Sequence, residues 1–270
     1  MSCDMKINHR FDTLRLAEAM PDAAGSERPF VFSADGSKSL YFTLDQLQSR
    51  MRDSHPTDLD VDYTRTMMGF LMFERHPRKI AMIGLGGGSL LKFCYRHLPQ
   101  TRFTVIEINP HVIALRQQFE VPVDAERITI ICADGADFVR DQAPGSAPGY
   151  DVLLVDGFDG QGQALSLCCQ SFYDDCFAVL KPQGIMVVNL HHDHPEHAIF
   201  TGRIRTAFNA NVLEIASAEK SNSVIFARKG HRISVDALRQ SDPLAGFDPE
   251  VRTQLGREFA RISWVMTEPA

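Results

Sequence analysis

The stretch IAMIGLGGGSLLKF, at residues 80–93, decides the fold of this chain. Its apolar beginning stops at a cluster of four glycines: Gly84, Gly86, Gly87 and Gly88. A second apolar run, at 103–106, then ends on Glu107. Glycines allow a backbone to approach a ligand closely, and an acid that ends the next strand can bind two ribose hydroxyls. The stretch therefore predicts a nucleoside-type ligand at the carboxyl edge of a parallel sheet.

The surrounding sequence repeats this alternation of apolar runs and helical patterns. The short apolar runs lie at 80–83, 103–106, 128–132, 151–155 and 185–190. Continuous Val-, Ile- and Leu-rich strands are buried on both faces, which favours a parallel sheet covered by helices on each side. Two further runs, at 211–215 and 223–228, predict an antiparallel hairpin at the sheet edge. We therefore predict an α/β chain with a Rossmann-like methyltransferase fold, whose seven-stranded sheet is mostly parallel and ends in an antiparallel C-terminal hairpin.

The ends of the chain carry smaller elements. Asp35-Gly36 is a hairpin signal between two short strands, so a small N-terminal β element is expected. Residues 62–75 have the apolar spacing of a core-facing helix, and 233–265 read as two amphipathic helices. The expected organisation has three parts: an N-terminal segment at 1–70, a nucleoside-binding catalytic domain at 71–230 and a helical extension at 231–270.

Composition narrows the function classes. The 270-residue chain has a formal net charge of −6, so it lacks the basic excess that a nucleic-acid partner requires. Its longest apolar runs are too short to span a bilayer, and its first residues lack the apolar core of a secretory signal. The six cysteines contain no Cys-x-x-Cys pair and read as reduced thiols rather than metal ligands. We expect a cytoplasmic protein with no membrane or nucleic-acid partner and no metal.

Asp134 comes one residue after the run at 128–132 and precedes Gly135. In this architecture its carboxylate can accept a hydrogen bond from an adenine amino group, while neighbouring backbone amides pair with the ring nitrogens. Asp is also a preferred N-cap residue, so it can begin the helix expected at 136–141. The two interpretations are compatible.

Two further acids, Asp156 and Asp159, follow the run at 151–155 in a glycine-rich loop. Carboxylates at this edge point into the crevice above the sheet. There they can orient an amine nucleophile and accept its proton, and they can also hold a second ammonium group. The alternative is a strand-end turn with solvated acids.

These motifs, in this order, resemble the spermidine synthase (polyamine aminopropyltransferase) family over residues 30–230. The matching pieces are LDQLQ at 44–48, Tyr63, IGLGGG at 83–88, VIEIN at 105–109, ADGADF at 133–138, DVLLVD at 151–156, SFYD at 171–174 and LKPQG at 180–184. The resemblance implies a homodimeric transferase of polyamine biosynthesis. Such an enzyme moves an aminopropyl group from decarboxylated S-adenosylmethionine to an amine and releases methylthioadenosine.

The resemblance also implies roles for individual residues. These are ribose binding by Glu107, adenine binding by Asp134, contact with the attacking amine by Asp156, a second gate-loop acid at Asp159, and walls of the cofactor and amine pocket at Gln48 and Tyr63. The gate loop here lacks the family's proline after the second acid.

Two departures from the family keep a second reaction open. Ser89 stands where the family has an aspartate that binds the aminopropyl amine, and the family's Tyr-His-Glu is Tyr63-Thr-Arg65 here. A charge-assisted hydrogen bond contributes about 1.5–3 kcal/mol, so Ser89 could reduce the preference for the decarboxylated cofactor by about tenfold or more. The alternatives are methyl transfer from intact S-adenosylmethionine and a non-catalytic nucleoside-binding protein.

Overall fold

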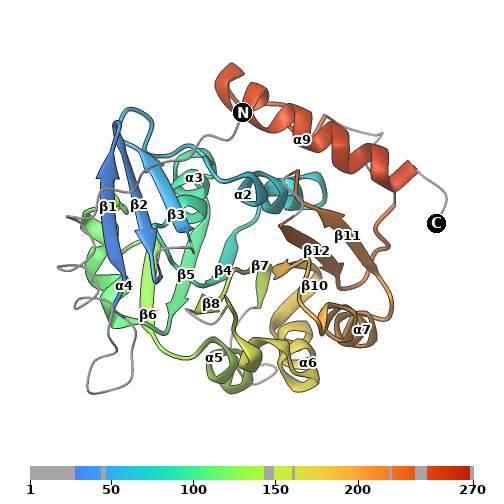
Figure 1. The fold of residues 1–270 in the computed structure, drawn as a ribbon. Coiled ribbons are helices and arrows are strands. Elements are labelled where there is room, and N and C mark those ends of the chain that lie inside the picture. Colours follow the sequence, from blue (N-terminus) through green and yellow to red (C-terminus); the bar gives the residue numbers. More distant parts are fainter. Residues whose placement is uncertain are drawn as a thin grey trace, which may run out of the picture.

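The computed structural model describes residues 28–43, 47–142, 149–159, 162–218, 221–234 and 242–267, apart from the side chain of Asp159. Its main sheet has seven strands in the order β11-β12-β10-β7-β4-β5-β6. Their bounds are β4 Lys79–Ile83, β5 Arg102–Glu107, β6 Ile128–Cys132, β7 Tyr150–Val155, β10 Leu180–His191, β11 Val212–Ala216 and β12 Asn222–Arg228. The strands from β10 to β6 are parallel, and β12 and β11 continue the sheet antiparallel. The predicted fold class is confirmed (Figure 1).

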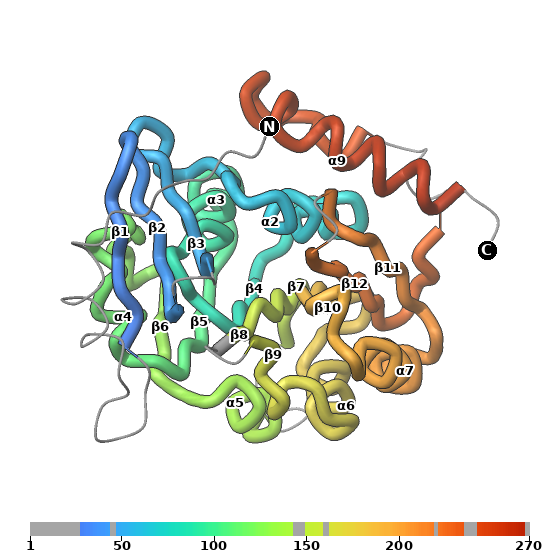
Figure 2. Tube along the Cα trace, in the orientation of Figure 1, coloured from blue at the N-terminus to red at the C-terminus, as the bar shows by residue number. Residues whose placement is uncertain are grey.

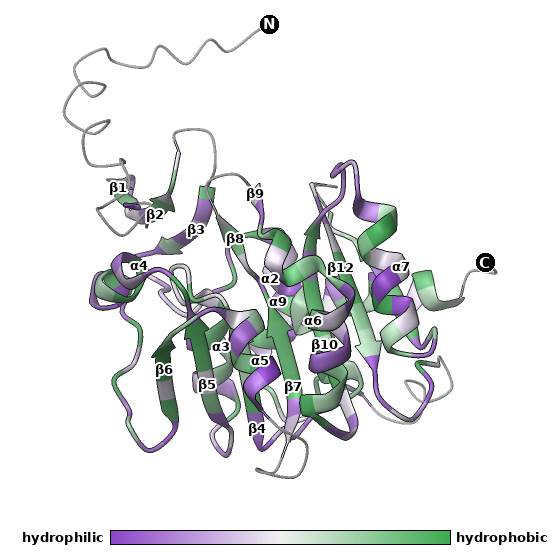
Figure 3. Ribbon diagram, turned by 90° about the horizontal axis from the view of Figure 1, so that it is seen from below, coloured by the Kyte–Doolittle hydropathy of each residue, from purple (hydrophilic) through white to green (hydrophobic). Residues whose placement is uncertain are grey.

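Helices cover both faces of this sheet. In Figure 1, α2, α3 and α9 lie on one face, and α5, α6 and α7 lie on the other. Their bounds are α2 Asp62–Met67, α3 Ser89–His97, α4 Pro110–Ala114, α5 Gly135–Asp141, α6 Gln170–Val179, α7 His197–Ala207 and α9 Pro249–Thr267; short 3-10 turns are η1 Met68–Met72, η2 Leu115–Gln117 and η3 Leu165–Cys168. Two apolar clusters fill the spaces between sheet and helices. Figure 3 shows the apolar residues concentrated on the strands, as expected for a sheet buried on both faces.

The N-terminal element is a separate sheet of three strands: β1 Phe30–Ala34, β2 Ser37–Tyr41 and β3 Leu47–Arg52. The predicted Asp35-Gly36 turn is present, and both residues have positive φ. The two expected strands are present as β1 and β2, and the third strand, β3, was not expected. The third strand alternates buried and exposed residues and carries two arginines, so it has no apolar run. Strand β3 packs beside α3 (Figure 2).

Two helical predictions need correction. The segment expected as one helix over 62–75 is α2 followed by η1, and it ends at Met72. At the other end, the described part of 233–265 contains one helix, α9, which runs on to Thr267; residues 235–241, where another helix was expected, lie outside the described residues. The buried side chains of α9 join the same apolar cluster as α2 and α3. The division into three parts remains a prediction.

Among the described residues, no helix is long and apolar enough to cross a membrane. The homodimer, the cytoplasmic location and the absence of a nucleic-acid partner remain predictions.

Candidate active site

The predicted site residues meet in a cavity of about 350 Å³ at the carboxyl ends of β4, β5 and β7. Its lining includes eight residues that the sequence singles out: Gln48, Tyr63, Gly84, Gly86, Glu107, Asp134, Gly135 and Asp156. Carboxyl ends of parallel strands share one edge of a sheet, and ligands of open α/β folds bind in the crevice outside that edge. The cavity therefore lies where a nucleoside-type ligand is expected.

The glycine loop after β4 is shaped by its contact with β7. Gly84 has a φ of +96°, and a Cβ at this position would lie 2.1 Å from the carbonyl oxygen of Asp156. No other residue type fits there without moving the end of β7. Gly84 and Gly86 line the main cavity. Gly88, the N-cap of α3, does not line it and instead packs against Val121.

Glu107 at the end of β5 is buried and holds this loop in place. Its Oε2 accepts a hydrogen bond from the backbone N–H of Leu85, and its Oε1 accepts one from Asn109, both at 2.8 Å. Burial raises the pKa of Glu107, and the backbone hydrogen bonds oppose this rise. Each carboxylate oxygen can accept more than one hydrogen bond, so ribose hydroxyls can be bound in addition. The ribose role itself remains a prediction.

Asp134 is the N-cap of α5, where its side chain accepts a hydrogen bond from the backbone N–H of Ala136 at 2.6 Å. Asp134 and Gly135 also line the cavity. The capping interpretation is therefore observed, and the cavity position leaves the adenine role open as a prediction.

Asp156 follows β7 and is held from two sides. The Tyr63 hydroxyl donates to its Oδ2 at 3.1 Å, and the Asn189 side-chain amide donates to its Oδ1 at 2.9 Å. Burial raises the pKa of Asp156, while the bonds from Asn189 and Tyr63 lower it. Burial, and then the charge of Asp156, raises the pKa of Tyr63 well above its ordinary value, so the tyrosine stays a neutral donor. The result is a half-buried carboxylate of fixed orientation at the cavity wall.

Sequence reasoning missed the amides behind Asp156. Asn189 is buried on β10 and accepts a hydrogen bond from the Asn222 amide at 3.0 Å. Ser221 in turn donates to Asn222. One signal was available, because Asn189 is a polar residue inside the apolar run at 185–190.

A small recess of about 30 Å³ adjoins the main cavity beside Ser89. The hydroxyls of Ser89 and Ser49 lie 3.2 Å apart, and a Cβ at Gly87 would lie 2.5 Å from the Ser49 hydroxyl. Among the described residues that line the recess, the only carboxylate is Asp156. The Ser49 contact was also missed, because β3 was not expected.

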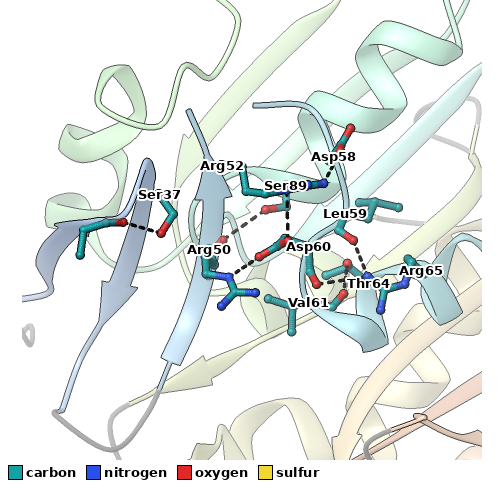
Figure 4. Close-up of polar contacts among 12 residues, drawn as sticks. Ser37, Arg50, Arg52, Asp58, Leu59, Asp60, Val61, Thr64, Arg65 and Ser89 are labelled. Atoms are coloured by element: carbon teal, nitrogen blue, oxygen red, sulfur yellow. Dashed lines mark hydrogen bonds and ion pairs between the residues drawn. The ribbon is translucent and has the colours of Figure 1, made fainter. Parts of the chain in front are cut away.

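Arg65 does not enter the site. Its guanidinium donates to the backbone carbonyl oxygens of Leu59 at 2.6 Å and Asp60 at 3.1 Å, in the segment just before α2 (Figure 4). Arg65 lines neither the cavity nor the recess beside it, so this departure from the family pattern gives no argument against a cationic amine. Residues two positions apart on a helix lie on roughly opposite sides of its axis, so Tyr63 faces the cavity and Arg65 does not.

The loop after Asp156 forms two short strands, β8 Phe158–Asp159 and β9 Gly162–Gln163. The Phe158 ring packs edge-on against His191 at 4.7 Å, and the His191 N–H donates to the Gln163 side chain at 3.2 Å. The side chain of Asp159 lies outside the described part, so its role as the second acid remains a prediction.

By its strand order and the position of its cavity, the chain has the fold of the S-adenosylmethionine-dependent methyltransferases. The chain is similar in structure to human methyltransferase-like protein 13 in complex with SAH, with a TM-score of 0.61, 20% identity and coverage of 78% of this chain and 94% of that one. It is also similar to a probable spermidine synthase from Corynebacterium glutamicum, with a TM-score of 0.64, 18% identity and coverage of 83% and 89%.

Sequence similarity identifies the family. Residues 61–215 match the profile of the spermine/spermidine synthase domain. The chain is 34% identical to a polyamine aminopropyltransferase of Chromobacterium violaceum over 246 residues, which cover 91% of this chain and 89% of that protein. The chain belongs to the spermine/spermidine synthase family, as the sequence motifs predicted.

Proposed function

We propose that this chain is a transferase that moves an aminopropyl group from decarboxylated S-adenosylmethionine to an amine acceptor in polyamine biosynthesis. The observation that carries the proposal is the orientation of Asp156, a half-buried carboxylate fixed by Tyr63 and Asn189 at the cavity wall. The Chromobacterium violaceum relative, named a polyamine aminopropyltransferase, supports the same reaction.

The cofactor's adenosine part fits the main cavity. Asp134 and Gly135 would bind the adenine, Glu107 the ribose hydroxyls, and Gly84 and Gly86 would lie against the nucleoside. Gln48, from β3, would cover it from the side of the N-terminal sheet. This arrangement directs the sulfonium toward Asp156 and the recess beside Ser89.

The reaction is an in-line displacement. The acceptor nitrogen uses its lone pair to attack the methylene carbon bonded to the sulfonium. The carbon–sulfur bond breaks, and its electron pair neutralises sulfur to give methylthioadenosine. Asp156 orients the amine and accepts the proton that it must lose. Positioning and this carboxylate supply the catalysis, with no covalent intermediate and no metal in the reaction.

The loop at 157–163 would close over both substrates and exclude water. Asp159 would hold the distal ammonium group of the acceptor. Tyr63 would form part of the amine subsite as well as orient Asp156.

Methyl transfer from intact S-adenosylmethionine is a second candidate, favoured by one observation. The recess beside Ser89 presents serine hydroxyls where the family has an aspartate. A carboxylate there would repel the carboxylate of the intact cofactor, and a serine does not. The position of Arg65 removes the other argument for this reaction. The non-catalytic interpretation leaves the orientation of Asp156 by Tyr63 and Asn189 unexplained.

Calorimetry with both cofactors on one protein preparation tests the proposal. We expect the decarboxylated form to bind more tightly. Its aminopropyl ammonium can pair with Asp156, and it lacks the carboxylate of the intact form, which Asp156 would repel. Tighter binding of the intact form would favour methyl transfer, and binding of neither would contradict both candidates.

A further inference from the structure

A cluster of histidine and acidic side chains lies beyond the end of β10, outside the lining of the cavity. It consists of His192, His197 and Glu214, and one ligand atom from each lies within 4.8 Å of the other two. Among the described residues, this is the only such group of three histidine, cysteine or acidic side chains. The three residues come from the turn after β10, the first turn of α7 and the edge strand β11. The proposed reaction uses none of them.

The hydrogen bonds of His197 determine which of its nitrogens faces the cluster. Its Nδ1 lies 3.1 Å from the backbone carbonyl oxygen of His191, which can only accept, so Nδ1 carries a proton. In a neutral imidazole the lone pair is then on Nε2. That nitrogen lies 2.7 Å from Oε1 of Glu214. A histidine held in this way by a backbone carbonyl is a common arrangement among metal ligands.

Glu214 is also oriented. The Ser223 hydroxyl donates to the same Oε1 at 2.7 Å, so this oxygen faces a hydroxyl donor and the lone-pair nitrogen of a neutral His197. Two acceptor atoms 2.7 Å apart need a proton or a cation between or beside them, and a metal ion is one way to supply it. His192 is exposed, and its ring centroid lies 5.7 Å from that of His197.

We propose that His192, His197 and Glu214 bind a divalent transition-metal ion of the zinc type. Two imidazole nitrogens and one carboxylate form a ligand set that zinc uses with a fourth position open to water. Tetrahedral zinc with bonds of about 2.0–2.2 Å places its ligand atoms about 3.3 Å apart. On binding, the 2.7 Å distance between His197 Nε2 and Glu214 Oε1 would lengthen slightly. The longer distances from the His192 ring nitrogen would shorten, which is possible because the His192 side chain is exposed.

The site is connected to the loop over the cavity through His191. The carbonyl oxygen of His191 anchors His197, its N–H binds Gln163, and its ring packs on Phe158. A bound ion would therefore fix the position of the residue on which the loop rests. This makes the ion a structural support at the base of the loop, apart from the transfer reaction itself.

The test is a zinc titration of the full-length protein, produced without a polyhistidine tag and stripped with a chelator. We expect about one ion per chain in calorimetry, and a rise in Tm when zinc is added. His192→Ala and Glu214→Gln should each weaken the affinity by about tenfold or more. Because His192 is exposed and Glu214→Gln preserves shape, both variants should fold.

His194→Ala is the matched control, because its ring packs on Phe200 and its Nδ1 accepts from the Glu196 N–H, outside the cluster. We expect it to bind zinc as the unaltered chain does. Cobalt substitution distinguishes the ligands, since thiolates such as the exposed Cys132 give strong sulfur-to-metal absorption and the proposed site does not. No binding, equal loss in His194→Ala, sulfur absorption, or an unaffected Glu214→Gln would each overturn the proposal.

Discussion

The Tyr63 hydroxyl donates a hydrogen bond to Oδ2 of Asp156 at 3.1 Å, joining two residues that are 93 positions apart. Tyr63 lies on α2 in the predicted N-terminal segment, and Asp156 directly follows β7 in the predicted catalytic domain. The site is therefore built across that boundary, and the N-terminal segment contributes directly to the orientation of the proposed catalytic acid.

Asp156→Asn should reduce turnover by about 10²–10⁴-fold, because the amide cannot accept the acceptor's proton. Binding of the nucleoside should persist, since the residues placed against adenine and ribose are unchanged. Steady-state kinetics and calorimetry on the same preparation measure the two effects. Asp137→Asn is the matched control, as Asp137 is an exposed acid paired with Arg140. Full activity of Asp156→Asn would remove Asp156 from the mechanism.

Tyr63→Phe should lower kcat/KM and shift its acidic limb to higher pH. Burial raises the pKa of Asp156, and the Tyr63 hydrogen bond is one of two contacts that oppose this rise. Without the hydroxyl, the carboxyl group holds its proton to a higher pH. Activity that needs the ionised acid is then lost earlier as the pH falls. A pH profile with an unmoved acidic limb would show that the hydrogen bond does not control this ionisation.

Asp156→Asn should also stabilise the fold at neutral pH, by about 1 kcal/mol. A carboxyl group whose pKa is raised on folding binds protons more readily in the folded chain. Its presence therefore costs stability as the pH rises from the ordinary value of 3.8 through the raised one. The gain in the variant should appear over that window and persist above it. Urea unfolding at several pH values measures the difference in free energy of unfolding between the variant and the unaltered protein. A difference that shrinks as the pH rises would contradict the prediction.

Ser89→Asp should move the preference toward the decarboxylated cofactor by about tenfold or more. The new carboxylate would pair with the aminopropyl ammonium and repel the carboxylate of the intact form. Ser49→Ala serves as the control, because it removes the hydroxyl bonded to Ser89 without adding charge. An unchanged ratio of the two dissociation constants would refute this account of Ser89.

Much of the fold follows from local sequence. Each run of apolar residues became a strand because a strand buried on both faces needs such a run. The acids Glu107, Asp134 and Asp156 were found because each follows such a run, and the carboxyl ends of parallel strands share an edge. The third N-terminal strand was missed because β3 alternates charged and apolar residues.

The partners of these acids depend on strand register, which local sequence does not encode. Val188 of β10 pairs with Val155 of β7, so the next residues, Asn189 and Asp156, lie side by side. The direction of Arg65 depends in the same way on how α2 begins and which of its faces meets the sheet. Spacing alone could not distinguish an arginine in the pocket from one bonded to the carbonyl oxygens of Leu59 and Asp60.

The most direct test of the proposed function is the identity of the nucleoside product. The protein is incubated with a diamine and either decarboxylated or intact S-adenosylmethionine. The products are then separated and identified by mass spectrometry. We predict methylthioadenosine and an amine heavier by one aminopropyl group from the decarboxylated cofactor. S-adenosylhomocysteine and a methylated amine from the intact cofactor, without methylthioadenosine from the other, would contradict the proposal.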